Sequence, residues 1–167
     1  TRDVQIASTE EKIKKTHTRF GQTASKLTSA RLKSAKKLSQ SISVSMQQLD
    51  MPHGKFEVHL NTYEDDTPKP NGLDQITFNV STNPDLPLDN MSHVVSGGEL
   101  SRISLAIQAN TAKHTAVPTV IYDEVDSGIG GDTANTVGQN LLAISEYCQV
   151  ICITHSPQVA SICDQQI

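Results

Sequence analysis

Two adjacent carboxylates follow a short apolar run in the second half of the chain. Val120, Ile121 and Tyr122 lead directly into Asp123 and Glu124. A strand that ends in two acids suits a magnesium–nucleotide site, because the first acid can hold Mg²⁺, usually through water, and the second can polarise an attacking water. A strand-end aspartate is also a common helix cap, so this pattern alone leaves both interpretations open.

A pair of glycines gives a second candidate, an anion-binding segment. Ser96, Gly97, Gly98 and Glu99 precede a helical pattern. The glycines let backbone N–H groups approach an anion, and the helix that we expect to start at about Glu99 directs the positive end of its dipole the same way. Ser96 adds a hydroxyl donor. The alternative is a glycine-rich turn in which Ser96 or Ser101 is an ordinary N-cap.

A histidine at a second strand end gives the third candidate. His155 follows the apolar residues 150–153 and Thr154. We expect it to lie beside Glu124, where a donor near a γ-phosphate could stabilise the negative charge of the transition state. A lone histidine is more often structural than catalytic, so this hypothesis depends on the two strands belonging to one sheet.

The pattern around these candidates predicts the sheet that they need. Helical patterns at 99–114 and 132–147 alternate with apolar runs at 119–122 and 150–153. Continuous apolar strands separated by helices indicate βαβ units and a buried parallel sheet. Because the chemistry of such sheets gathers at the carboxyl ends of the strands, the three candidates should converge there.

A long helix followed by a β-hairpin is predicted in the first half of the chain. Residues 8–50 contain no proline, and their apolar positions recur on one helical face. These positions are Phe20, Ala24, Leu27, Ala35, Leu38, Ile42, Met46 and Leu49. We expect the helix, either an arm of a coiled coil or an ordinary surface helix, to end at 51–54. Alternation at 56–60 and 76–80 predicts a long-looped hairpin, and 83–90 a further loop.

Charge and composition narrow the function classes. The net charge of −4 combines +6 in residues 1–50 (10 Lys and Arg against 4 Asp and Glu) with −10 in residues 51–167 (4 against 14), which indicates two structural units or a basic interaction arm. The chain has no Trp and 4% aromatic residues, so a base-stacking platform is not expected. It has no apolar run long enough for a membrane span and no secretory signal. Three cysteines without a C-x-x-C pair predict reduced thiols in a cytoplasmic protein.

The three motifs together resemble the second half of the head of an ABC-type ATPase. The string from Ser96 to Glu99 is similar to the signature motif, 120–124 to the Walker B strand, and His155 to the switch histidine. The helical arm points to the SMC-like branch, and within it the chain resembles the RecN family of bacterial DNA repair proteins. The residues that carry this resemblance are 51–54, 80–84, 95–108, 123–131 and 154–160.

Two departures from the wider ABC pattern refine the resemblance. Transporter and SMC-type heads usually place an aspartate six residues after the Walker B glutamate, where this chain has Gly130. This argues against a transporter subunit, and no role is carried over to Asp126, which lies earlier in the loop. No G-x-x-x-x-G-K-[ST] string occurs in these residues. We therefore expect a C-terminal fragment, clipped at Ile167 and inactive alone, whose P-loop half lies upstream.

The resemblance implies a division of the chain and roles for the candidate residues. Residues 1–50 would be a helical arm at the end of a coiled coil, and 51–167 the C-terminal lobe of an α/β ATPase head, a parallel sheet with flanking helices. ATP and Mg²⁺ would be the cofactors, with Asp123 as the Mg²⁺ ligand and with Glu124 and His155 as catalytic residues. The residues that would contact the γ-phosphate of ATP held by another head are Ser96, Gly97, Gly98 and Glu99.

The resemblance also implies partners and a cellular role. The partners would be a second copy of the head in an ATP-dependent homodimer, the upstream P-loop half of the same protein, and DNA, but no membrane. The protein would act in DNA double-strand break repair and recombination, in the bacterial cytoplasm at the nucleoid. Two alternatives remain: a non-enzymatic coiled-coil scaffold, and the ATPase subunit of an ABC transporter.

Overall fold

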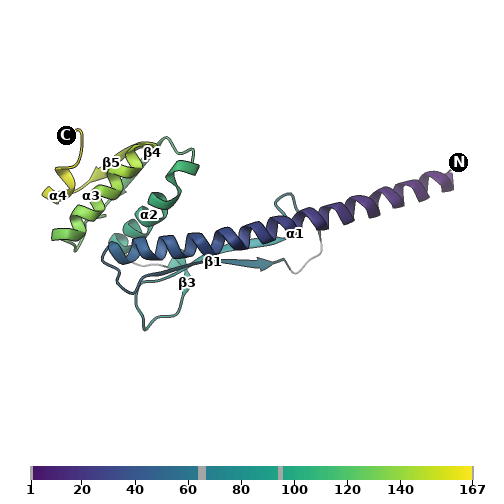
Figure 1. Ribbon diagram of the computed structural model, residues 1–167, viewed down its shortest axis with the longest axis horizontal. Helices are drawn as coiled ribbons and strands as arrows, with labels where there is room; N and C mark the ends of the chain where they lie inside the picture. The colour runs from purple at the N-terminus through teal and green to yellow at the C-terminus, as the bar shows by residue number, and fades with distance from the viewer. Residues whose placement is uncertain (1, 64–66, 94–95, 167) are drawn as a thin grey trace. The chain divides into compact units, whose positions relative to one another are not determined.

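A computed structural model describes residues 2–63, 67–93 and 96–166. Outside these ranges lie the expected loop residues 64–66, Val94 and Val95 before the signature string, and Ile167. In chain order the elements drawn in Figure 1 are α1 (Arg2–Gln48), β1 (Lys55–Thr62), β2 (Asp74–Ser81), β3 (Asp89–Asn90), η1 (Met91–His93), α2 (Gly97–Thr111), η2 (Ala112–His114), β4 (Thr119–Asp123), α3 (Gly131–Ser145), β5 (Gln149–Ile153) and α4 (Pro157–Ala160).

The chain divides into two compact units. The first comprises Thr1–Lys37 and Val58–Thr77, and the second comprises Leu38–Glu57 and Phe78–Ile167. The division between an arm and a head lobe near residue 50, which the resemblance implies, stays a prediction.

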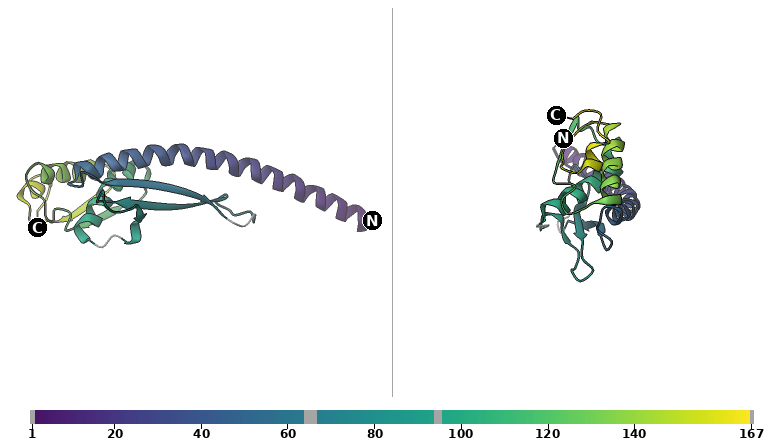
Figure 2. Two further views of the ribbon diagram at one scale, coloured as in Figure 1. Left: turned by 90° about the horizontal axis from the view of Figure 1, so that it is seen from below. Right: turned by 90° about the vertical axis from the view of Figure 1, so that its left-hand side faces the viewer.

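The helix α1 confirms the predicted long helix. It begins before residue 8 and ends at Gln48, and Figure 2 shows it without a break. It stops where the N–H of Met51 donates to the carbonyl of Met46 at 3.3 Å and Asp50 takes a left-handed φ of 62°.

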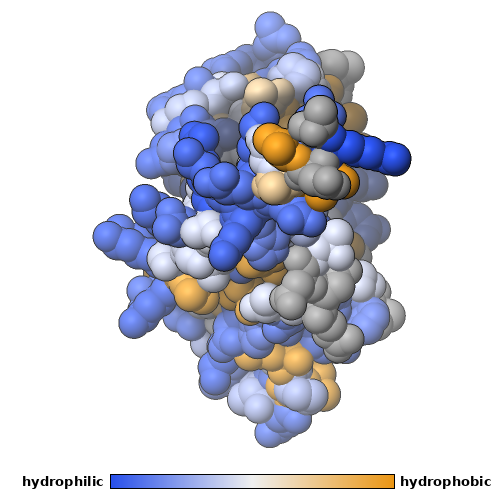
Figure 3. All heavy atoms as spheres, turned by 90° about the vertical axis from the view of Figure 1, so that its right-hand side faces the viewer, coloured by the Kyte–Doolittle hydropathy of each residue, from blue (hydrophilic) through white to orange (hydrophobic). Residues whose placement is uncertain are grey.

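The described side chains between positions 2 and 19 are exposed. The face of the molecule drawn in Figure 3 is mostly hydrophilic with a few separate apolar patches. In the described residues no helix is long and apolar enough to cross a membrane.

A buried carboxylate ties the start of β2 to α1 in the first unit. Asp74 is 8% exposed, accepts hydrogen bonds from Thr28 Oγ1 at 2.7 and 2.9 Å, and pairs with Arg31 Nη1 at 2.9 Å. Burial alone would raise the pKa of Asp74, but the hydrogen bonds from Thr28 and Arg31 and the charge of Arg31 hold it below its ordinary value. The carboxylate is therefore ionised and paired at neutral pH.

The second unit has its apolar core where the predicted helical face continues. Ile42 and Met46 of α1 and Leu49, which directly follows its end, are completely buried, and Phe56 of β1 is 2% exposed. Phe56 stacks on Phe78 of β2 with ring centroids 5.7 Å apart. Each side chain of this size contributes roughly 1.5–3 kcal/mol when it is fully buried. The predicted face of the helix is thus confirmed in this unit.

The predicted β-hairpin is present, with one strand more than expected. The strands β1 and β2 are neighbours in a sheet of order β1-β2-β3. The short strand β3 pairs antiparallel with β2, with Asn79 opposite Asn90 and Val80 opposite Asp89. The expectation of a loop throughout 83–90 is therefore wrong for its last two residues. Because both are polar, they give no alternating apolar signal.

The strands β4 and β5 confirm the predicted parallel pairing. Asp123 lies opposite Ile153, so both strands end at the same edge. One face of the pair is not buried as expected, because Ile121, Ile151 and Ile153 are 66%, 43% and 57% exposed. Tyr122, on the opposite face, is 6% exposed. In this chain the sheet is covered on one face and presents an apolar surface on the other.

The helix α2 differs from its prediction in its start and in its buried face. It begins at Gly97 rather than at Glu99, so the two glycines form its first turn instead of a preceding loop. Its buried face is not simply apolar, because Leu100 is 38% exposed whereas Arg102 is 7% exposed. The helix buries this arginine because a backbone carbonyl accepts from its guanidinium, as described below.

Asp74 gives a test of the first unit. Replacing it by asparagine (Asp74→Asn) should lower the free energy of unfolding at pH 7 by about 1–3 kcal/mol, because Arg31 and Thr28 lose an ionised partner. Since the pKa of Asp74 is lower in the folded protein than its ordinary value of 3.8, this contribution is fully present above pH 3.8 and is lost as pH falls below it.

Urea unfolding of wild type and variant at pH 7 and at pH 3 measures the difference. The matched control is Asp85→Asn, since Asp85 is an exposed loop carboxylate and should change stability by less than about 0.5 kcal/mol. A destabilisation by Asp74→Asn that grows as the pH is lowered would contradict the account.

Candidate functional site

The serine of the glycine segment caps α2. Ser96 has extended backbone angles, φ −85° and ψ 123°, and its Oγ accepts a hydrogen bond from the N–H of Glu99 at 3.4 Å. Ser96 is thus the N-cap of α2, as the alternative interpretation of the sequence predicted. Gly97 and Gly98 follow as the first helical residues, and their N–H groups are among those that have no partner inside a helix. A capped helix start with exposed N–H groups remains suited to an anion.

The second acid of the carboxylate pair lies against this helix start. Glu124 has a left-handed φ of 56°, which is unfavourable for a residue with a Cβ and often marks functional sites. Its Oε2 is 3.2 Å from the position that a Cβ on Gly97 would occupy. The carboxylate therefore sits at the positive end of the α2 dipole, where a negative charge is stabilised.

Gly98 lets the loop after β4 approach α2 just as closely. A Cβ on Gly98 would lie 3.2 Å from the Cβ of Ser127 and 3.5 Å from the backbone oxygen of Glu124. The start of α2 thus lies close to this loop at both glycines, but only at Gly98 is the near atom a Cβ rather than the end of a flexible side chain.

Two hydrogen bonds hold the same approach from the next turn of the helix. Ser101 Oγ donates to the carbonyl of Asp123 at 2.8 Å, and Arg102 Nη1 donates to the carbonyl of Ser127 at 2.9 Å. Arg102 is buried, and its Nε has no hydrogen-bond partner in the described part of the chain. The first two turns of α2 are therefore fixed to the end of β4 and to the loop that follows.

The structure brings His155 to the edge that carries Asp123 and Glu124. Because Ile153 lies opposite Asp123, the strands end at the same edge, where Glu124 is one residue beyond β4 and His155 two residues beyond β5. All three side chains are exposed. Among the described residues His155 forms no hydrogen bond with either acid. The shared edge is therefore confirmed, and the placement of His155 beside Glu124 stays a prediction.

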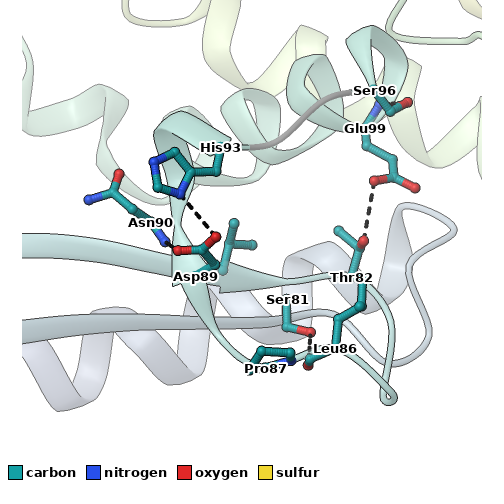
Figure 4. A pocket seen from close by; sticks show the side chains of 10 residues that line it. Ser81, Thr82, Leu86, Pro87, Asp89, Asn90, His93, Ser96 and Glu99 are labelled. Carbon is teal, nitrogen blue, oxygen red and sulfur yellow. Dashed lines mark hydrogen bonds and ion pairs between the residues drawn. The ribbon is translucent and has the colours of Figure 1, made fainter.

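Glu99 points into a separate cavity. Figure 4 shows Thr82 Oγ1 donating to Glu99 Oε2, at 3.2 Å, in a cavity of about 440 Å³ whose rim also includes Ser96. Across the cavity His93 and Asp89 form a pair at 2.9 Å, and this contact lowers the pKa of Asp89. Of the signature residues, Glu99 is thus engaged away from Glu124.

The chemistry of the donor groups fits the nucleotide and the metal that the sequence suggests. In the described residues no three or more His, Cys, Asp or Glu side chains gather to hold a metal ion. Mg²⁺ needs only one or two protein carboxylates when waters and phosphate oxygens complete its octahedron, so Asp123 suffices. The glycines and the N–H groups at the start of α2 form a cradle that suits a phosphate oxygen.

The fold defines the class of protein first: the chain has the fold of part of an Smc-type head domain. An Smc head domain with an extended coiled coil, derived from Pyrococcus furiosus and bound to the C-terminal domain of ScpA, has a TM-score of 0.54 and 20% identity over 81% of this chain and 31% of that chain. An Smc head domain with a coiled coil and joint from Pyrococcus yayanosii has a TM-score of 0.54 and 17% identity over 80% and 24%. These similarities establish the fold.

Sequence similarity then relates the chain to particular proteins. The DNA repair protein RecN of Haemophilus influenzae is 48% identical over 138 residues, 83% of this chain and 25% of that protein. RecN of Vibrio cholerae is 45% identical over 148 residues (89% and 26%), and RecN of Xylella fastidiosa 40% over 159 residues (95% and 28%). The chain is a homologue of the RecN proteins over most of its length, as its motifs predicted.

The chain spans about a quarter of the length of these curated relatives, 25% to 28%. No family model matches the chain.

Sequence reasoning missed four polar residues that hold the site together. These residues are Ser101, Arg102, Asp126 and Thr154. The available signal was their position inside or beside the three motifs, since a polar residue within an apolar helix or next to a strand end often satisfies a backbone group. The roles assigned to the candidate site residues stay predictions.

The two glycines give a matched pair of variants. Gly98→Ala should lower the free energy of unfolding by about 1–3 kcal/mol, because the new methyl would lie 3.2 Å from the Cβ of Ser127, which moves only with its backbone. Gly97→Ala should be neutral or stabilising by up to about 1 kcal/mol, because only the mobile end of Glu124 must move and alanine favours a helix. Urea unfolding of both variants measures the difference, and equal destabilisation by the two would contradict the close approach described above.

Proposed function

We propose that this chain is part of an SMC-like ATPase that acts in DNA double-strand break repair and recombination. The observation that carries the proposal is the contact between the start of α2 and Glu124 at the edge where β4 and β5 end. This arrangement joins an anion cradle, a metal-binding carboxylate and a candidate base. The RecN homologues and the SMC-type fold support this role over a scaffold or a transporter subunit.

The chain's own residues would share the work of hydrolysis. Asp123 would hold Mg²⁺, which when bound neutralises charge on the phosphate oxygens. The exposed carboxylate of Glu124 would orient a water molecule and accept its proton. His155 would donate a hydrogen bond to the charge that develops on the γ-phosphate.

The start of α2 would complete the nucleotide site of a second copy. Ser96 Oγ and the N–H of Gly98 would donate to the γ-phosphate of ATP held on the other head. A phosphate at this position would repel the Glu124 carboxylate that now lies beside Gly97, because the two anions would come within a few ångströms. Engagement would therefore turn Glu124 away from its own α2. ATP would join two heads, and hydrolysis would separate them.

The remaining partners follow from charge and from exposed apolar surface. The P-loop half, upstream in the same protein, would supply the nucleotide's main phosphate contacts and cover the exposed face of Ile121, Ile151 and Ile153. DNA would meet exposed lysines of α1 such as Lys33 and Lys36, with an affinity that falls as salt rises. A solvated helix face is the alternative for any single lysine.

The direct test is Glu124→Gln in the full-length protein that carries this chain. The amide cannot accept the proton of the attacking water, so kcat should fall by roughly 10²–10⁴-fold while ATP binding is retained. It also removes the repulsion described above, so ATP-bound dimers should accumulate. Steady-state ATPase assays with and without DNA, together with size-exclusion chromatography in ATP, measure both effects.

The matched control is Glu146→Gln, which changes an exposed glutamate at the end of α3 and should leave turnover unchanged. Normal turnover by Glu124→Gln would show that Glu124 is not the base. A wild-type protein that hydrolyses no ATP would overturn the proposed function itself.

A further inference from the structure

The carboxylate of Asp126 is buried beside the proposed catalytic edge and has no part in the mechanism above. It is 5% exposed and lies in the loop after β4, two residues beyond Glu124. A buried carboxylate is costly unless its oxygens are satisfied. The oxygens of Asp126 therefore need hydrogen-bond donors.

Its partners are the two residues on either side of His155. Thr154 Oγ1 donates to Asp126 Oδ2 at 2.5 Å, and the N–H of Ser156 donates to the same oxygen at 3.0 Å. The N–H of Ser156 also lies 3.0 Å from Thr154 Oγ1. The three groups form a closed hydrogen-bonded cluster that brackets His155.

The side chain of His155 has no comparable anchor. It is exposed, and among the described residues it makes no side-chain hydrogen bond. The place of its imidazole is therefore set by the backbone of Thr154 and Ser156, which Asp126 holds. Through this cluster the loop that carries Glu124 is also joined to the loop that carries His155.

The charge of Asp126 strengthens the link. Burial would raise the pKa of Asp126, but the hydrogen bonds from Thr154 and from backbone N–H groups, with the nearby His155, hold it below its ordinary value. Hydrogen bonds to an ionised acceptor are roughly twice as strong as those between neutral groups. The residue is thus an anion at neutral pH.

One atom of the cluster is left unsatisfied. Asp126 Oδ1 is buried and has no hydrogen-bond partner in the described part of the chain. A buried oxygen without a partner destabilises the folded state, so the carboxylate is a poor choice for packing alone. Its presence therefore needs an explanation other than packing.

We propose that Asp126 is a positioning residue that fixes the backbone on both sides of His155 and so sets where its imidazole lies relative to Glu124. The inference rests on the proposed ATPase function. Six residues after the Walker B glutamate this chain has Gly130 instead of an aspartate. An aspartate at that position therefore cannot supply the role that we assign to Asp126.

The test uses the full-length protein and removes one hydroxyl. Thr154→Val keeps the shape of the side chain but cannot donate to Asp126, so the His155 loop should shift and kcat should fall roughly tenfold to a hundredfold, while the KM for ATP stays the same. Thr154→Ser restores the donor and should recover most of the lost kcat. Asp126→Asn, which keeps the size but loses the charge, should lower kcat in the same direction. Thr136→Val, a matched loss of hydroxyl on α3, should have no effect on kcat.

A double-mutant cycle separates positioning from stability. In a His155→Ala background Thr154→Val should reduce kcat no further, because the residue on which it acts is gone. Thermal unfolding confirms that each variant is folded before its kinetics are compared.

Undiminished kcat in folded Thr154→Val and Asp126→Asn, or full additivity with His155→Ala, would overturn the positioning role while leaving the ATPase function intact. A wild-type full-length protein that hydrolyses no ATP would instead count against the proposed function.

Discussion

The parallel pairing of β4 with β5 is the constraint on which the candidate site depends. Parallel strands end at a common edge, so the register that sets Asp123 opposite Ile153 also brings Glu124 and His155 to that edge. Side chains alternate between the two faces of a strand, and a slip of one residue would exchange the exposed Asp123 with the buried Tyr122. Burial also raises the pKa of the Tyr122 hydroxyl, which keeps it neutral. The apolar core thereby fixes the register of the polar residues.

The end of β4 and the loop that follows it are hydrogen-bonded both to α2 and to the residues that flank His155. On one side α2 holds it through Ser101 and Arg102, and on the other Asp126 holds the residues that flank His155. Glu124 lies between these two attachments with a strained backbone. Strain of this kind costs about 1–3 kcal/mol and persists only where the surroundings enforce it. A small displacement at the start of α2 would therefore move the candidate base.

Periodicity and motif spacing sufficed to predict the long helix, the hairpin, the parallel pair and the edge at which the candidates meet. They failed where a polar residue acts through tertiary contacts. Asp89 and Asn90 form a strand without any apolar alternation, and Arg102 is buried because Ser127 offers it a carbonyl. The sequence predicts a start of α2 at about Glu99, two residues late, because glycines give no helical signal although both lie in the first turn.

The central claim is that Ser96 and Glu124 of one chain serve two different nucleotides in a pair of heads. Mixing full-length Ser96→Arg with full-length Glu124→Gln tests it most directly. If each site combines the signature residues of one head with the acids of the other, a mixed dimer has one intact site, and the mixture should recover about a quarter of wild-type ATPase activity from two inactive variants. If the mixture stays inactive although both variants are folded and associate, the two residues act on the same nucleotide and the account is wrong.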